Sequence, residues 1–219
     1  MTKNNSTNIT HENTKRMPKH FEMVFIAILI GLICFLTISG LGFIPIGPFR
    51  LTFLTLPVAI GSVILGPLAG LILGTAFGIA SFITCFGIDP LGTFLLGVNP
   101  FYTFLFCVVP RMLCGVIPAL IYKKTSKYDK SKILSSSICC MLTALLNTVL
   151  FLSVLWLLFG NDFINNSDLI SLLGGMKVEN MAILFTAFAG TNAIIEAGVG
   201  LVLGCAICKA LLTMVKKLN

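Results

Sequence analysis

Long apolar stretches separated by short polar breaks dominate this chain. The clearest stretch runs from residue 51 to residue 88 without a charged side chain and is interrupted only by Gly66-Pro67. It is about twice as long as the ~20 residues that one helix needs to cross ~30 Å of hydrocarbon. The pattern therefore predicts two membrane helices joined by a tight turn.

The remaining breaks divide the chain in the same way. Lipid offers no water to backbone N–H and C=O groups, and the sequence lacks the alternation of a transmembrane β-barrel, so the spanning elements should be helices. We predict an all-α membrane protein, a bundle of six transmembrane helices at roughly 22–40, 51–65, 67–86, 100–122, 133–160 and 180–209. The connections at 41–50, 87–99 and 161–179 would then share the outer side of the membrane.

Composition predicts a short polar tail followed by one membrane domain. Hydrophobic residues make up 57% of the chain and charged residues 11%, whereas about 25% of the residues in soluble domains are charged. We predict that the polar residues 1–20 form a flexible cytoplasmic tail and that residues 21–219 form a single membrane domain. This organisation leaves no room for a soluble catalytic or nucleotide-binding domain.

The net charge of +7 indicates orientation in the membrane and not a nucleic-acid partner. With six spans, most of the 15 Lys and Arg residues fall on one side, in the N-terminal tail, between the fourth and fifth spans, and after the sixth. Arg50 and Lys177 lie on the other side, and Arg111 lies inside a span. By the positive-inside rule, both termini should lie in the cytoplasm.

The eight cysteines lie nearly all in apolar spans. Only Cys205 and Cys208 form a Cys-x-x-Cys pair, and both histidines, His11 and His20, lie in the tail. A zinc site would need more ligands close together. We therefore expect small buried apolar side chains, with no metal site, no cofactor and no disulfide.

Small residues mark two helix faces. One face of the third predicted span carries a glycine at every fourth position: Gly66, Gly70, Gly74 and Gly78. Such spacing lets another backbone approach closely, so we expect a helix-packing face. In the first span, Ala27 and Gly31 form a single small-xxx-small pair that faces either a neighbouring span or a partner protein.

Polar residues inside the membrane are costly and therefore informative. Arg111 lies near mid-depth of the fourth span, which is punctuated by Pro100, Pro110 and Pro118. Irregular helices are tolerated where they line a cavity. We therefore expect a pocket that opens to the outside. Its candidate substrate-binding residues are Arg111, Asn147, Asn192, Glu196, Asn99, Tyr102 and Trp156.

Two interpretations of Arg111 remain open at this point. It is either the structural ion-pair partner of Glu196 or the group that binds a substrate carboxylate, whose two oxygens match the guanidinium fork. Both interpretations hold if the substrate and Glu196 share the arginine. Asn147 and Asn192 have a similar alternative, since each forms either an interhelical hydrogen bond or a contact with the ligand.

Five segments, in this order, resemble one known family. They are 42–50 (GFIPIGPFR), 56–70 (LPVAIGSVILGPLAG), 109–111 (VPR, with Gly115), 146–150 (LNTVL) and 192–196 (NAIIE). They resemble the substrate-binding S component of energy-coupling factor (ECF) vitamin transporters, over about residues 20 to 215. Within that family, the proline-rich segment at 45–48 and the Pro110-Arg111 pair look most like the pantothenate branch.

The resemblance implies a multi-pass protein of the bacterial cell membrane that is a transport subunit and not an enzyme. Such a subunit would capture pantothenate from outside and deliver it through a shared module of one transmembrane scaffold (T) protein and two ATPases. The sequence has no GxxxxGK[ST] phosphate-binding loop, so these partners must hydrolyse the ATP. Family precedent also implies that the face with Ala27 and Gly31 docks onto the module.

The alternatives are another vitamin as the ligand, or a different class of membrane protein. Within the family, the vitamin is alternatively pyridoxine, a hydroxymethylpyrimidine-like thiamine precursor, riboflavin or folate. A stand-alone secondary transporter would ordinarily show internal repeats and membrane carboxylates, and this sequence shows one buried Glu and no detectable repeat. An intramembrane serine protease would need a histidine within a span, which the sequence lacks.

Overall fold

The computed structural model describes residues 18–46, 49–126, 128–129, 133–165, 197–204 and 206–210. This part of the chain is nearly all helical. Its helices are α1 (Lys19–Ile38), α2 (Thr55–Leu65), α3 (Pro67–Thr84), α4 (Pro90–Val98), α5 (Pro100–Thr125), α6 (Ile133–Asn165) and the π-helical turn η1 (Gly200–Gly204). A two-stranded antiparallel hairpin, β1 (Phe43–Ile46) and β2 (Phe49–Thr52), lies between α1 and α2.

Four helices in the described residues are long and apolar enough to cross a membrane: α1, α3, α5 and the part of α6 at Leu134–Asp162. They correspond to the predicted spans at 22–40, 67–86, 100–122 and 133–160. Shorter apolar helices occupy Thr55–Leu65 and Ala197–Ala210. Much of the predicted span at 180–209 lies outside the described residues. The total of six spans and the cytoplasmic location of both termini therefore stay predictions.

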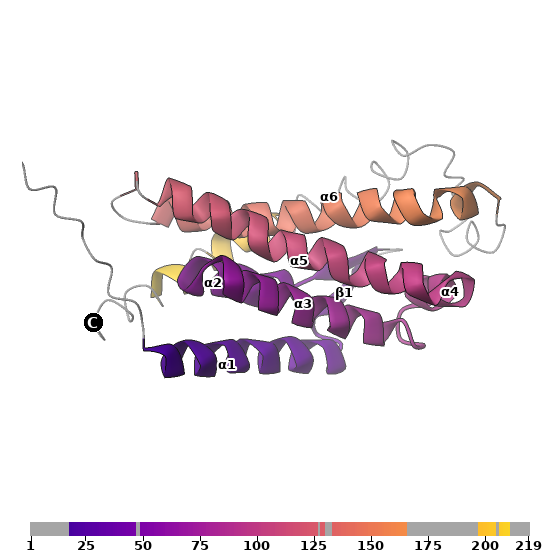
Figure 1. The fold of residues 1–219 in the computed structure, drawn as a ribbon, viewed down its shortest axis with the longest axis horizontal. Coiled ribbons are helices and arrows are strands. Elements are labelled where there is room, and N and C mark those ends of the chain that lie inside the picture. Colours follow the sequence, from indigo (N-terminus) through magenta and orange to yellow (C-terminus); the bar gives the residue numbers. More distant parts are fainter. Residues whose placement is uncertain are drawn as a thin grey trace, which may run out of the picture.

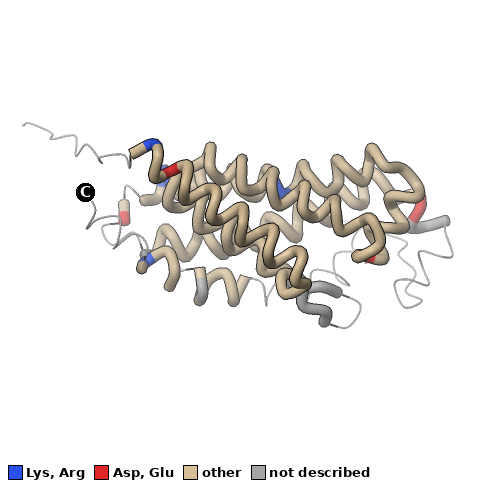
Figure 2. The backbone as a smooth tube through the Cα atoms, turned by 90° about the horizontal axis from the view of Figure 1, so that it is seen from below, with Lys and Arg blue, Asp and Glu red and all other residues tan. Residues whose placement is uncertain are grey.

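The long helices lie side by side in layers (Figure 1). Helix α5 lies between α3 and α6, whereas α1 lies on the far side of α2 and α3 and packs against both of them. The start of α1, the end of α5 and the start of α6 lie at one end of the bundle, and α4 lies at the other (Figure 1). In Figure 2, the charged residues gather mainly at these two ends, which leaves a long middle zone with almost no charge.

The predicted start of the second helix was wrong. The second helix begins at Thr55 and not at residue 51, because the preceding residues form the hairpin, in which Phe43 pairs with Thr52. The predicted connection at 41–50 therefore contains strand structure, and the apolar character of residues 51–54 did not distinguish strand and turn from helix. Pro57 consequently lies in the first turn of α2, where proline is tolerated.

The predicted connection at 87–99 is also largely helical. Helix α4 begins with Pro90, whose fixed φ angle suits the first helical position. The side chain of Asp89 caps it, since its Oδ2 accepts a hydrogen bond of 3.1 Å from the backbone N–H of Gly92. This short helix lies directly before α5 at one end of the bundle (Figure 1).

The glycine face of α3 packs against the backbone of α5, as expected from its spacing. A Cβ atom on Gly78 would lie 2.7 Å from the Cα of Val108, one on Gly74 would overlap the carbonyl oxygen of Arg111, and one on Gly70 would overlap the carbonyl oxygen of Gly115. Gly66 does not belong to this face. It forms the α2–α3 turn with φ = 92°, and a Cβ there would meet nothing within 4 Å.

Gly74→Ala is expected to destabilise the bundle. The added methyl group would push α3 away from the carbonyl of Arg111, and overpacking of this kind costs about 1–3 kcal/mol. Thermal unfolding in detergent measures the effect. Gly97→Ala in α4 is the matched control, since a Cβ on Gly97 meets nothing within 4 Å. Equal melting temperatures for both variants would contradict the packing.

Candidate functional site around a buried arginine

Arg111 is the buried charge at the centre of the described bundle. It lies in α5, is only 6% exposed, and its backbone carbonyl faces the glycine stripe of α3 at Gly74. Its Nη1 donates a hydrogen bond of 2.9 Å to the backbone carbonyl of Phe106 on the same helix. The close approach of α3 and α5 therefore fixes the backbone from which the guanidinium extends.

Three aromatic rings surround this guanidinium. Its Cζ lies 5.6 Å from the ring centre of Phe77 on α3, 5.6 Å from that of Phe106 on α5 and 4.6 Å from that of Phe151 on α6. A cation over an aromatic face gains ~0.5–2 kcal/mol, more when water is excluded. The cage of Phe77, Phe106 and Phe151 thus stabilises the charge.

Two buried polar atoms in this region make no hydrogen bond to the described residues. The Nε of Arg111 and the Oδ1 of Asn147 are both buried and have no hydrogen-bond partner among the described residues. Asn147 is 6% exposed and lies one helical turn before Phe151, so the two share a face of α6. A buried donor and a buried acceptor left open near one cage are unusual, because each costs ~1–3 kcal/mol unless something binds it.

Glu196, the predicted ion-pair partner of Arg111, lies outside the described residues, as does Asn192. Within the described part of the chain, no carboxylate forms an ion pair with Arg111. The helical segment that follows does face the bundle. A Cβ on Gly200 would lie 3.1 Å from the carbonyl oxygen of Cys140 in α6, and one on Gly204 would lie 2.7 Å from the Cβ of Cys140.

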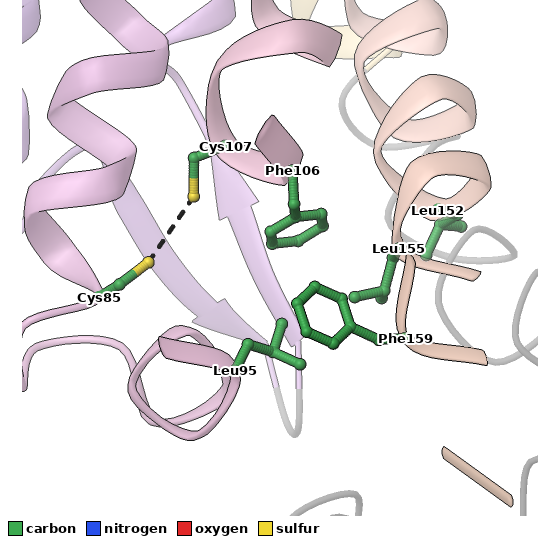
Figure 3. Packing of buried hydrophobic residues seen from close by; sticks show 7 residues of the cluster. All are labelled: Cys85, Leu95, Phe106, Cys107, Leu152, Leu155 and Phe159. Atoms are coloured by element: carbon green, nitrogen blue, oxygen red, sulfur yellow. Dashed lines mark hydrogen bonds between the residues drawn. The ribbon is translucent and has the colours of Figure 1, made fainter. Parts of the chain in front are cut away.

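Aromatic contacts continue from the cage toward the α4 end of the bundle. The rings of Phe106 and Phe151 are 4.5 Å apart, those of Phe106 and Phe159 are 6.4 Å apart, and those of Phe159 and Tyr102 are 6.3 Å apart. Figure 3 shows Phe106 and Phe159 within a cluster with Leu95, Leu152 and Leu155. Trp156 packs against the same cluster and is partly buried.

The structure thus separates the predicted site residues into groups. Arg111 and Asn147 lie at the cage, whereas Tyr102 and Trp156 lie along the aromatic cluster between the cage and the α4 end of the bundle. Asn99 has a local structural contact, since its Oδ1 caps α5 by accepting from the N–H groups of Phe101 and Tyr102. The cage phenylalanines were missed by sequence reasoning. The spacing of four between Asn147 and Phe151 was the one signal available for any of them.

Two pairs of cysteine side chains lie close together within the described bundle. The Sγ atoms of Cys85 and Cys107 lie 3.7 Å apart beside Phe106 (Figure 3), and those of Cys140 and Cys208 lie 3.8 Å apart. No disulfide forms among the described cysteines, most of which are buried. No group of three or more potential metal ligands occurs within the described residues.

The small residues of α1 lie on its open face. Ala27 and Gly31 are exposed, and a Cβ on Gly31 would meet nothing within 4 Å. The opposite face of α1 is buried, with Leu29 and Ile33 at 5% and 0% exposure. Of the two alternatives left by the sequence, packing of this pair against a neighbouring span is therefore not seen among the described residues.

Comparisons with known proteins found a matching family model and a curated relative. A family model described as "ECF transporter, substrate-specific component" matches residues 21–208. The pantothenic acid transporter PanT of Lactococcus lactis subsp. cremoris (strain MG1363) is 28% identical over 205 residues, which cover 88% of this chain and 94% of PanT. The resemblance to S components, and to the pantothenate branch among them, is confirmed.

Proposed function

The chain belongs to the family of ECF transporter substrate-specific components, and from this premise we propose that it is the high-affinity pantothenate-binding subunit of an ATP-driven importer. The main observation that supports pantothenate as the ligand is the buried guanidinium of Arg111, whose Nε has no hydrogen-bond partner among the described residues. Pantothenate has one carboxylate, and similarity to PanT supports the same vitamin. Pyridoxine and the pyrimidine-like compounds lack a carboxylate.

The proposed binding mode uses groups that are open in the structure. The ligand carboxylate accepts from the Nε–H of Arg111, one of the donors that a bidentate guanidinium–carboxylate pair uses. Asn147 Oδ1 accepts from a hydroxyl or amide N–H of the ligand. The apolar chain lies against the aromatic rings, and Tyr102 and Trp156 line the approach from outside.

Asn192 and Glu196 complete the proposed site from the sixth span. They precede Gly200 and Gly204 at the same four-residue spacing, and these glycines face α6. Glu196 then shares Arg111 with the ligand carboxylate, so that the arginine has two anionic neighbours when pantothenate is bound. Asn99 stays in the proposed set as a residue of the outer rim, through the helix end that it caps.

The proposed topology has six spans, cytoplasmic termini and a pocket that opens to the outside of a bacterial cell. The described basic residues support it. Lys19 begins α1, Lys123 and Lys124 end α5, and these two helix ends lie together in Figure 1. Their side is the cytoplasmic one by the positive-inside rule. The partners are the bilayer, one T protein and two ATPases, because this sequence carries no phosphate-binding loop.

The purified chain alone is expected to bind one pantothenate and to hydrolyse no ATP. Titration calorimetry in detergent and a phosphate-release assay measure the two properties. Riboflavin, folate, pyridoxine and a hydroxymethylpyrimidine are the competing ligands, and native mass spectrometry of protein from rich medium identifies any vitamin that co-purifies. Binding of one of these in place of pantothenate would transfer the proposal to that vitamin, and ATPase activity in pure protein would overturn it.

A further inference from the structure

We propose that Pro110 is a positioning residue for Arg111, because its missing N–H frees the backbone carbonyl that holds the guanidinium. In an α-helix, the carbonyl of residue i accepts from the N–H of residue i+4. The residue four positions after Phe106 is Pro110, which has no N–H to donate. The freed carbonyl of Phe106 accepts instead from Arg111 Nη1 at 2.9 Å.

The hydrogen bond from Arg111 Nη1 to Phe106 O gives a partner to two buried polar groups at once. Phe106 O would otherwise be a buried acceptor without its helical donor, and Arg111 would be a buried cation whose neighbours are three phenylalanine rings. Each would cost free energy if left alone. Adjacent positions 110 and 111 therefore act as a unit, in which the proline creates the acceptor and the arginine uses it.

The hydrogen bond also selects which donors face the ligand. With Nη1 held by Phe106 and the guanidinium packed among three rings, rotation of the side chain is restricted. The Nε–H remains open. A preorganised donor loses little conformational entropy when a ligand binds, so affinity is gained without any added contact. This second step rests on the proposed function, whereas the hydrogen bond itself is present in the unliganded chain.

Helix α5 supplies its own control. Pro118 is also buried inside this helix, and like Pro110 it has no N–H to donate to the carbonyl four residues before it. The described contacts of the Arg111 guanidinium are with Phe77, Phe106 and Phe151, and none is with Cys114 O. Pro118→Ala therefore restores a helical N–H in the same helix without touching the arginine.

The first experiment needs no ligand. In protein labelled with ¹⁵N-arginine, Arg111→Met identifies the signals of Arg111 among those of Arg16 and Arg50. The parent and Pro118→Ala are expected to show slow rotation of the Arg111 guanidinium, with resolved Nη signals. In Pro110→Ala, the new N–H competes for Phe106 O, so the Nη signals should average. Unchanged signals in Pro110→Ala would overturn the inference.

The second experiment measures ligand affinity. Pro110→Ala is expected to weaken pantothenate binding about tenfold or more, the factor for losing a hydrogen bond to a charged group, and Pro118→Ala by far less. The alcohol analogue, which lacks the carboxylate, should lose little in either variant. Combined with Arg111→Met, the proline substitution should cost nothing further, as expected for two residues that act through one group.

A third substitution separates the missing N–H from the proline ring. Replacing Pro110 with the α-hydroxy acid of alanine keeps the position without an N–H, and it should retain the affinity of the parent. Loss of affinity equal to that of Pro110→Ala would assign the effect to the ring and overturn the inference. If the parent itself binds no pantothenate, the proposed function fails, and the ¹⁵N spectra still decide the role of Pro110.

Discussion

The double variant Ala27→Leu with Gly31→Leu is expected to abolish vitamin uptake by cells while the purified chain binds its ligand as the parent does. Both residues lie on the exposed face of α1, and a Cβ on Gly31 meets nothing within 4 Å. Two leucines there would not disturb the buried face of α1. They would prevent the close helix approach that small residues allow.

A matched pair of small substitutions sharpens this experiment. Ala27→Ser with Gly31→Ala changes the same positions but keeps both side chains small, so uptake should persist. Radiolabelled vitamin uptake in cells and equilibrium binding in detergent are measured for all three proteins, with expression normalised by immunoblot. Equal loss of binding and uptake in the leucine variant would mean that this face supports the fold. Undiminished uptake would mean that nothing docks there.

Hydropathy predicted the long helices because their length and apolar character are sufficient to identify them. Helices α1, α3, α5 and α6 fall within a few residues of the predicted limits. The hairpin and α4 were missed for a physical reason. In a short connection between long helices, an apolar segment satisfies its backbone equally well as a short strand pair or a short helix, and composition does not distinguish them.

The candidate site was predictable only in part. Intramembrane charge and polarity led to Arg111 and Asn147, because both are expensive in hydrocarbon and both are buried in the structure. The cage was not predictable, since Phe77, Phe106 and Phe151 belong to three different helices and are three of 18 phenylalanines. Only long-range packing of α3, α5 and α6 selects them from the others.

The glycine spacing in α3 illustrates the same limit. It predicted a packing face correctly at Gly70, Gly74 and Gly78, but it did not predict α5 as the partner. The structure adds that this face lies opposite the backbone of Arg111. Close packing and the candidate site are therefore linked, because the glycines set the distance between the helices that carry Phe77 and Arg111.

Arg111→Met is expected to weaken pantothenate binding by ~2–5 kcal/mol, the range for truncating one member of a buried charge pair. Methionine retains apolar bulk among the three rings but removes the charge and the open Nε–H. The ligand carboxylate would then enter an apolar cage without a counter-ion. Since 1.4 kcal/mol is a factor of ten, the dissociation constant should rise by a factor of roughly 30 or more.

The alcohol analogue of pantothenate distinguishes the two interpretations of the arginine. If Arg111 binds the carboxylate, the parent prefers pantothenate to the alcohol, and Arg111→Met abolishes that preference, because the alcohol brings no charge to the site. If the arginine is only the counter-ion of Glu196, the folded variant binds pantothenate as tightly as the parent. The companion variant Glu196→Gln completes the test, because removing a competing anion should strengthen carboxylate binding when Arg111 is shared and leave it unchanged when it is not.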